Sequence, residues 1–323
     1  MKRVWGIIVS ICACCVLVFS LAGCGGQEQP KSEVGTMETN GSQTVASTEP
    51  FYVLVVGNDT RIGTMEINKP QYADGNARSD VMMLLRVDPK TYQVAIVTVP
   101  RDTATTINGQ TVKINEGYAQ GGMNGAVEQV ESLTGVDIKY YFNMTFVQFE
   151  DFITNMDGVT ADVPIDMSLV DIVHGDKVSL TKGDNQQLNN EEALVLARQR
   201  KQYADDLDAC RQIQDRQIVQ SLITKVASRP SDEASTYASI LTTGCETNMS
   251  ADELTEYLTM FMDNASSLSF ISGTGPYKGG IDAATQLWLA PRDEKTWAKV
   301  IATIEAGGDP TTVVALPRVA AAN

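Results

Sequence analysis

Four charged residues stand at the ends of two apolar runs in the first third of the chain: Arg78, Asp80, Arg101 and Asp102. The runs cover residues 81–87 and 94–99, and their spacing predicts two buried strands joined by a turn at residues 88–91. An antiparallel hairpin brings its start and its finish to the same edge of a sheet, so the four charged side chains should meet. They could simply neutralise one another, or they could hold an anion together with a metal ion.

Arginine is concentrated at similar positions elsewhere, although the 323-residue chain is acidic, with a net charge of −15. Seven of its twelve arginines lie at polar positions beside apolar runs: Arg61, Arg78, Arg101, Arg198, Arg200, Arg211 and Arg216. Guanidinium groups bind phosphate bidentately and stay charged. Carboxylates next to them suit Mg²⁺, which prefers oxygen ligands and phosphate oxygens. This combination favours phosphoryl transfer from a pyrophosphate, which depends mainly on positioning and charge neutralisation.

Other chemistries find little support in the sequence. The chain has one histidine, His174, in a polar loop, and no G-x-S-x-G motif accompanies it, which disfavours a hydrolase triad. A Walker A motif and His/Cys zinc clusters are also absent from the sequence. Strong acidity disfavours nucleic acid as a partner. Cys210 and Cys245 could pair in an oxidising compartment or remain two buried thiols.

Several elements are expected to position the charged residues. The apolar run 51–56 reads as a central strand, and Asp59 follows it at a strand's carboxyl end, where ligand crevices form in open α/β sheets. Residues 138–144 read as another strand. The helix after Thr145 carries the aromatic stripe Phe146, Phe149 and Phe152, which could be core or could line a lipid tunnel.

Two further helices carry arginines. Arg198 and Arg200 can address one ligand only if their helix has ended by about Arg198, because residues two apart diverge on a helix but share a face on an extended chain. A long helix over residues 208–228 places Arg211 and Asp215 on its apolar face. That pair is either a buried ion pair or the part of the helix that faces the site.

The N-terminus predicts export and membrane attachment. Residues 1–23 combine Lys2-Arg3, an apolar stretch and small residues before a cysteine, as in a lipoprotein signal peptide. We expect cleavage before Cys24 and lipid on its sulfur, with an uncleaved membrane anchor as the alternative. Residues 24–50 are polar and form a flexible tether. The protein is thus expected at the extracellular face of the cell membrane, lipid-anchored.

Eight short motifs occur in a characteristic order: Asp59-x-Arg61, Arg78-Ser-Asp80, Pro100-Arg101-Asp102, Lys113-Ile-Asn115, Gly121-Gly122, Asp157-Gly158-Val159, Ala197-Arg198-x-Arg200 and Asp208-x-x-Arg211. In this order and spacing they resemble the LytR-CpsA-Psr family. The resemblance implies a catalytic domain over residues 51–310, followed by a loose tail at 311–323. It implies an α/β fold, a three-layer α/β/α sandwich around a mixed, largely antiparallel sheet, with an apolar tunnel for a polyprenyl chain.

The resemblance also implies an activity. Enzymes of this family work on the outer face of a Gram-positive membrane. They move a glycopolymer, such as teichoic acid or capsule, from an undecaprenyl-pyrophosphate carrier onto peptidoglycan. For this chain it implies an Mg²⁺-dependent phosphotransferase in cell wall biogenesis, and a pyrophosphatase side activity is compatible with the same site.

Roles carry over motif by motif. Asp59 and Asp80 resemble the carboxylates that hold Mg²⁺. Seven residues are expected to bind the pyrophosphate substrate: Arg78, Arg101, Lys113, Arg198, Arg200, Arg211 and Arg216. Of these, Arg78 and Arg101 are also assigned to catalysis, together with Asp102 as a support for the arginines or as a base.

One departure from the family stands out. Where the family usually has Arg-Gln-Gln, this chain has Gln214-Asp215-Arg216. Asp215 could pair with Arg211 and weaken its hold on phosphate. This motivates the alternative of a catalytically impaired polyprenyl-pyrophosphate binding protein of the cell envelope.

Overall fold

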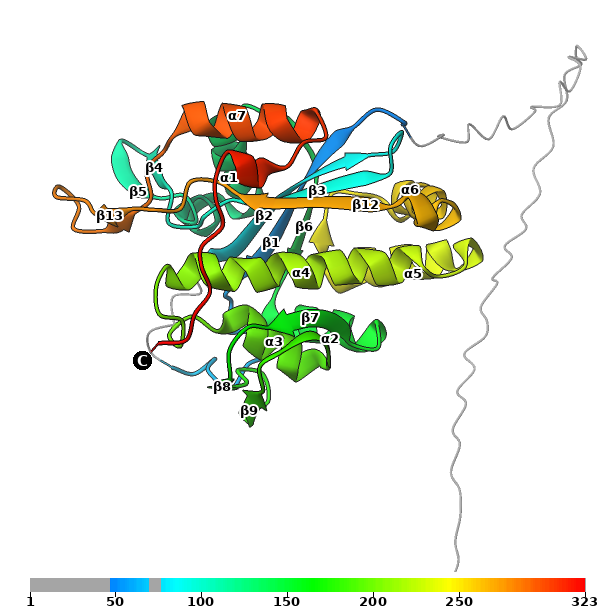
Figure 1. Cartoon of the computed structure of the whole chain (residues 1–323), viewed down its shortest axis with the longest axis horizontal. Coiled ribbons are helices and arrows are strands. Elements are labelled where there is room, and N and C mark those ends of the chain that lie inside the picture. Colours follow the sequence, from blue (N-terminus) through cyan, green and yellow to red (C-terminus); the bar gives the residue numbers. More distant parts are fainter. Residues whose placement is uncertain (1–46, 70–76, 323) are drawn as a thin grey trace, which may run out of the picture. The chain divides into compact units, whose positions relative to one another are not determined.

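A six-stranded mixed sheet forms the centre of the protein in the computed structural model, which describes residues 47–69 and 77–322. The predicted signal peptide, Cys24 and most of the tether lie outside the described residues. The strand order is β11-β6-β1-β2-β3-β12 (Figure 1). The strands are β1 (Phe51–Asn58), β2 (Ser79–Asp88), β3 (Gln93–Thr98), β6 (Ile138–Met144), β11 (Glu246–Thr247) and β12 (Ser269–Thr274). The pairs β1–β2, β2–β3 and β6–β11 are antiparallel, and β1–β6 and β3–β12 are parallel.

The predicted hairpin is confirmed. Strands β2 and β3 pair with Met83 opposite Thr98 and Val87 opposite Val94. At the turn between them, the Asp88 carboxylate accepts hydrogen bonds from the backbone N–H groups of Lys90 and Thr91, at 3.0 and 3.3 Å. Aspartate is favoured at such turns because its side chain replaces a backbone acceptor.

Both faces of the sheet are covered by helices, which confirms the three-layer prediction (Figure 1). On one face, α1 (Glu116–Thr134) and α7 (Glu294–Glu305) pack on Leu54 and Leu84, with Trp297 fully buried. On the other face, Val53 and Leu85 belong to a cluster with residues of α4 (Leu207–Ala227), α5 (Ala234–Gly244) and α6 (Ala251–Asp263).

A further group of elements covers the side of α4 that faces away from the sheet (Figure 1). It consists of α2 (Phe146–Asn155), α3 (Asn190–Arg198), β7 (Val159–Val163), β8 (Met167–Val170), β9 (Lys177–Leu180) and β10 (Gly183–Leu188). This group has its own apolar core, to which α4 contributes Ile218, Leu222 and Val226. Helix α4 is therefore packed between two cores.

Two small hairpins lie beside each other at one end of the sheet, β4–β5 and β13–β14 (Figure 1). Their strands are β4 (Ala104–Ile107), β5 (Gln110–Lys113), β13 (Gly280–Ile281) and β14 (Trp288–Leu289). The remaining elements are the 3₁₀ helices η2 (Ser231–Glu233), η3 (Ala265–Ser267) and η4 (Pro310–Thr312). Among the described residues, no helix is both long and apolar enough to cross a membrane. Cys210 and Cys245 are buried free thiols and do not pair.

The C-terminal segment is not the loose tail that we expected from the sequence. The backbone N–H of Ala204 donates to the carbonyl oxygen of Ala320 at 2.9 Å, and that of Ala322 donates to Gln202 at 2.8 Å. Val319 packs against the core below α4. This short extended segment pairs with the backbone around Tyr203. The pairing satisfies backbone N–H and C=O groups that would face solvent in a loose tail.

Candidate active site

The charged residues of the β2–β3 hairpin meet at one edge of the sheet, as predicted. A guanidinium nitrogen of Arg101, Nη1, lies 2.6 Å from Asp80 Oδ1. Asp102 pairs with Lys113, with 2.6 Å between Oδ1 and Nζ, and its other oxygen lies 3.9 Å from Arg101 Nε. Arg78 turns to Glu116 at the start of α1, at 2.9 Å. Ion pairs thus link all four residues to partners at this edge.

Asp208, at the start of α4, joins three arginines from separate parts of the chain. Its Oδ1 atom lies 3.3 Å from Arg101, 3.8 Å from Arg200 and 3.2 Å from Arg211. Burial opposes the charge of this carboxylate, but the Arg211 and Arg101 guanidiniums hold the pKa of Asp208 below its ordinary value. We assigned no role to Asp208 from the sequence; its spacing to Arg211, three residues along a helix, was the available signal.

Arg198 and Arg200 can both address the same ligand because α3 ends between them. The helix finishes at Arg198, and Gln199 has an extended backbone (φ −71°, ψ 126°). Both arginines line one cavity. The guanidinium of Arg198 also lies over the ring of Phe146, 5.4 Å from its centroid, and Arg61 lies over the same ring at 5.2 Å. Cation–π contacts of this kind help to orient a guanidinium. Arg61 also forms ion pairs with Asp59 and Glu66, at 3.8 and 3.3 Å.

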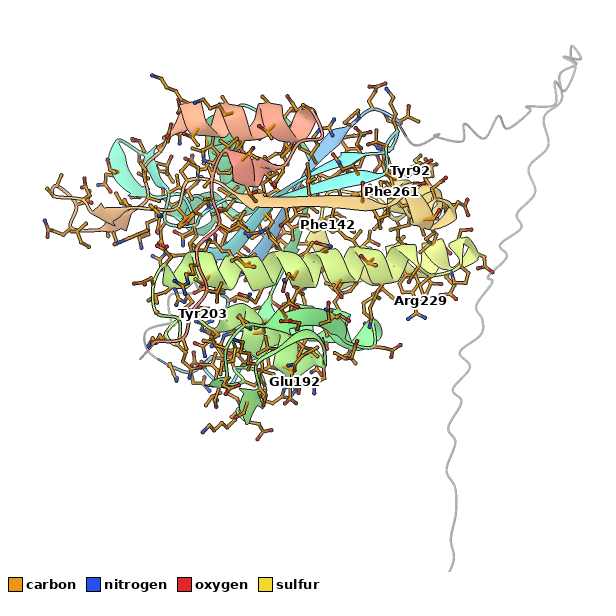
Figure 2. The ribbon with its side chains drawn as sticks, in the orientation of Figure 1. Tyr92, Phe142, Glu192, Tyr203, Arg229 and Phe261 are labelled. Carbon is orange, nitrogen blue, oxygen red and sulfur yellow. The ribbon has the colours of Figure 1, made fainter. Side chains whose placement is uncertain are left out.

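The cavity has a volume of about 400 Å³ and is apolar along most of its lining. Its walls come from the sheet, α2, α4 and α6, and include Val53, Met83, Leu85, Phe142, Phe149, Val219, Ile223 and Phe261. Figure 2 labels two of these side chains, Phe142 and Phe261. The aromatic stripe of α2 lines the same cavity through Phe146, Phe149 and Phe152. The charged groups that line it are Arg61, Asp80, Arg101, Arg198, Arg200, Arg211 and Asp215.

A second pocket, of about 360 Å³, adjoins the cavity at the Asp80–Arg101 pair, and these two residues line both spaces. Three predicted site residues line only this second pocket: Arg78, Asp102 and Lys113. Asp59 lines neither space, but its Oδ1 accepts a hydrogen bond from the backbone N–H of Arg78 at 2.7 Å. Burial raises the pKa of Asp59, and the nearby Asp80 charge adds to that effect.

A comparison with protein families adds a test independent of this geometry. The model of the LytR_cpsA_psr family matches residues 23–299. The chain belongs to the LytR-CpsA-Psr family. The resemblance read from the eight motifs is thereby confirmed, and the match covers the whole of the sheet and both arginine-bearing helices.

Curated relatives and solved structures of LytR-CpsA-Psr proteins agree. TagU of Bacillus mycoides, named as a polyisoprenyl-teichoic acid–peptidoglycan teichoic acid transferase, is 32% identical over 224 residues, which are 67% of each chain. TagU of Bacillus cereus strain AH820 is 34% identical over 192 residues, 59% of this chain and 57% of that relative. The crystal structure of B. subtilis TagV is 25% identical, with a TM-score of 0.66, and the match covers 84% of this chain and 100% of TagV.

The departure from the LytR-CpsA-Psr pattern at residues 214–216 now has a structural description. Asp215 lines the cavity and forms an ion pair with Arg211. Arg216 is buried away from the cavity and donates to the hydroxyl groups of Thr98, at 2.6 Å, and Ser272, at 3.0 Å. The sequence predicted that Arg216 binds substrate. Its position on α4 instead places its guanidinium against β3 and β12, outside the lining of the cavity.

A second titratable cluster, outside the lining of the cavity, is formed by Glu150 of α2 with Asp171 and His174 of the β8–β9 connection. His174 Nδ1 lies 2.9 Å from Asp171 and 3.4 Å from Glu150. One donor atom from each side chain falls within 4.8 Å of the others, as in some metal sites. The Asp171 oxygens already accept the backbone N–H groups of Val173 and His174, so we interpret the cluster as a tie between α2 and this loop.

Glu150→Gln should stabilise the protein at pH 8 and have little effect at pH 5. Glu150 is 2% exposed; burial, with a contribution from Asp171, raises its pKa to about 7. Between pH 4.5 and 7 the folded protein therefore holds a proton that the unfolded chain has lost, so this group's contribution to stability falls as pH rises through that range. Removing the buried charge should add roughly 1–3 kcal/mol at pH 8.

Urea unfolding at the two pH values measures this difference. Glu191→Gln is the matched control, because Glu191 is 3.9 Å from the same imidazole but more exposed, and its effect should stay within about 0.5 kcal/mol. A Glu150→Gln variant that is less stable than the parent protein at pH 8 would show that the Glu150 charge is not a cost.

Proposed function

We propose that this protein is an Mg²⁺-dependent phosphotransferase that moves a teichoic acid-like glycopolymer from a polyprenyl pyrophosphate onto peptidoglycan. The observation that carries the proposal is the cavity, which combines a long apolar lining with a cluster of arginines at one place. An isoprenoid chain is bound by an apolar lining, and a pyrophosphate is bound by clustered arginines. The transferase names of the relatives support a glycopolymer as the transferred group.

The charges around the cavity suit a pyrophosphate anion. Five arginines and two aspartates line it, so the lining itself presents more positive than negative groups. Asp208, which is not part of the lining, pairs with three of these arginines. The arginines approach from α3, α4 and the ends of β1 and β3, so they can contact several oxygens of one diphosphate at once. Preorganised guanidiniums of this kind stabilise the charge that develops in phosphoryl transfer without reorganising during the step.

The reaction follows from this arrangement. A hydroxyl oxygen of peptidoglycan attacks the phosphorus that carries the glycan, and a new P–O bond forms. The bond between that phosphorus and the bridging oxygen of the pyrophosphate breaks. Polyprenyl monophosphate leaves, and Arg101, Arg200 and Arg211 bind its negative charge. Water in place of the hydroxyl would give the pyrophosphatase side reaction.

Asp59 and Asp80 fit the proposed Mg²⁺. Their carboxylate oxygens are the ligands that this ion prefers, and they lie close enough for the Asp80 charge to raise the pKa of Asp59. A cation between two mutually repelling carboxylates would relieve that repulsion. When bound, it would neutralise phosphate charge and orient the diphosphate.

Transfer can be tested with the full-length protein, a short-chain polyprenyl-pyrophosphate glycan, Mg²⁺ and purified peptidoglycan. We expect covalent attachment of the glycan and an equal amount of released polyprenyl phosphate. Donor binding without release would contradict the enzyme proposal. It would favour the second candidate function, a catalytically impaired binding protein. The observation behind that candidate is that Asp208 and Asp215 both pair with Arg211.

Asp59→Asn should raise the Mg²⁺ concentration needed for half-maximal transfer by at least roughly tenfold, because a neutral amide binds the ion more weakly than a carboxylate. Metal titrations of the transfer rate measure the change. Asp151→Asn, an exposed position on α2, is the control and should leave the titration unchanged. An Asp59→Asn titration that coincides with that of the parent protein would remove Asp59 from the metal site.

We further propose that the protein is held at the extracellular face of the cell membrane by lipid on Cys24. The sequence before Cys24 supports this, and a Cys24→Ser protein should lack the mass of the lipid.

A further inference from the structure

The second pocket differs from the cavity in its charge, although the two share a wall. Its charged residues form three ion pairs: Arg78–Glu116 at 2.9 Å, Arg101–Asp80 at 2.6 Å and Lys113–Asp102 at 2.6 Å. Positive and negative groups are therefore equal in number, whereas arginines outnumber aspartates around the cavity. A balanced pocket does not select for a diphosphate. It suits a ligand that is rich in hydrogen-bonding groups and has little charge of its own.

The remaining lining is apolar or carries unused hydrogen-bonding capacity. Val112 and Leu287 contribute apolar surface, and Leu287 is 37% exposed. Asn115 is 4% exposed, and its side-chain oxygen has no hydrogen-bond partner among the described residues. A buried amide oxygen without a partner costs free energy, which a ligand hydroxyl or amide N–H could recover.

The hairpin that carries Leu287 is fastened to the reactive edge itself. The backbone N–H of Ala290, just after β14, donates to the carbonyl oxygen of Asp102 at 2.9 Å, and that of Ala104 donates back to Ala290 at 2.8 Å. Figure 1 shows β13 beside β4 and β5 at this end of the sheet. The position of Leu287 is thus set relative to Asp102 and Arg101.

We propose that this second pocket is the acceptor subsite, which binds a sugar unit of the peptidoglycan glycan and presents its hydroxyl to the phosphorus; this rests on the function proposed above. In-line displacement needs the entering and leaving oxygens on opposite sides of the phosphorus. Asp80 and Arg101 line both the pocket and the cavity, so a phosphorus at this pair would have the polyprenyl side in the cavity and the acceptor in the pocket. The size of the pocket is within the range of about 300–1,000 Å³ that is usual for small-ligand sites.

Each lining group then has a role. Val112 and Leu287 cover an apolar face of the sugar ring, and Asn115 accepts a hydrogen bond from its polar edge. The attacking hydroxyl loses its proton to the Asp102 carboxylate as its oxygen bonds to phosphorus. Asp102 is paired with Lys113, and a loose transition state loses the hydroxyl proton late, so the step does not need a strong base.

The test compares Leu287→Ala with Ile281→Ala in the full-length protein. Both side chains are exposed on the same hairpin, but only Leu287 lines the pocket. The probe is the disaccharide of N-acetylglucosamine and N-acetylmuramic acid with the lactyl carboxyl group amidated, so that it is uncharged, titrated by calorimetry without donor. We expect roughly tenfold weaker binding for Leu287→Ala, and parent-like binding for Ile281→Ala. In transfer assays, Leu287→Ala should raise the acceptor KM and shift the outcome from transfer toward hydrolysis.

Equal disaccharide binding by Leu287→Ala and the parent protein would overturn the subsite, whether or not transfer occurs. Loss of binding in both variants would also overturn it, since Ile281 lies outside the pocket. If the parent protein binds the disaccharide in the expected pattern but transfers no glycan, the subsite stands and the proposed enzyme function fails. Asn115→Ala supplies a second variant: it should weaken binding of the same disaccharide, and parent-like affinity would count against the pocket.

Discussion

Arg101→Ala should reduce glycopolymer transfer by roughly 10³-fold or more, the effect usual for an arginine that stabilises phosphoryl-transfer charge. Among the described residues, Arg101 is the one arginine that lines both the cavity and the second pocket. It forms ion pairs with Asp80 and Asp208. Truncation removes the guanidinium that lies where the two spaces adjoin. The fold should survive, because the site edge keeps the Lys113–Asp102 and Arg211–Asp208 pairs.

Two companion variants make the result specific. Arg101→Lys keeps a positive charge but loses the planar fork, so it should recover only part of the activity. Arg229→Ala removes a partly exposed arginine just beyond the far end of α4, labelled in Figure 2, and should transfer glycan at the parent rate. Polyprenyl phosphate release measures the rate, and circular dichroism checks the fold. An Arg101→Ala protein with more than about a tenth of the parent rate would place the clamp elsewhere.

Arg211→Leu should destabilise the protein by about 3–5 kcal/mol, because it leaves a buried carboxylate without its partner. Arg211 is 4% exposed and pairs with Asp215, which is equally buried. Burial raises the pKa of Asp215 to about 7, against the opposing effect of Arg211. Asp215 therefore makes the protein less stable as pH rises from about 4 to 7, and the loss in Arg211→Leu should be larger at pH 8 than at pH 5.

A double variant separates charge from packing. Arg211→Leu/Asp215→Leu replaces the pair by apolar groups of similar size and should recover most of the stability while remaining inactive in transfer. Urea unfolding of the parent protein, Arg211→Leu, Asp215→Leu and the double variant at pH 8 gives the four free energies of this cycle. If the double variant is as unstable as Arg211→Leu alone, the unpaired Asp215 charge is not the cause of the loss.

Much of the fold could be predicted because its signals are local. The strand over residues 138–144 and the helix after Thr145 both appear in the structure, where Thr145 forms a capping box with Gln148. The hairpin was predictable from two apolar runs and a turn, and its geometry alone brought Asp80 and Arg101 together. The sequence required α3 to end by about Arg198 if Arg198 and Arg200 were to address one ligand, and the helix does end there.

The division of the site into two spaces could not be predicted. Adjacent residues in a sequence motif point in different directions: Arg101 reaches both spaces, whereas Asp102 lines only the second. The role of Asp208 depends on arginines from three segments, and the direction of Arg216 depends on the rotation of α4 against β3 and β12. The pairing of residues 320–322 with the backbone around Tyr203 has no local sequence signal. Each of these depends on tertiary packing.

Helix α4 is packed between two apolar cores, and this has a consequence for how the protein opens. Backbone amides in the middle of the helix can exchange with solvent only when the contacts on both of its sides are lost, so local fluctuations of either core do not expose them. Arg211 lies on the same helix, toward its N-terminal end, so the doubly packed stretch anchors the element that carries it. A fluctuation in one core leaves the helix held by the other. The guanidinium of Arg211 is thus carried by an element that is anchored from two sides.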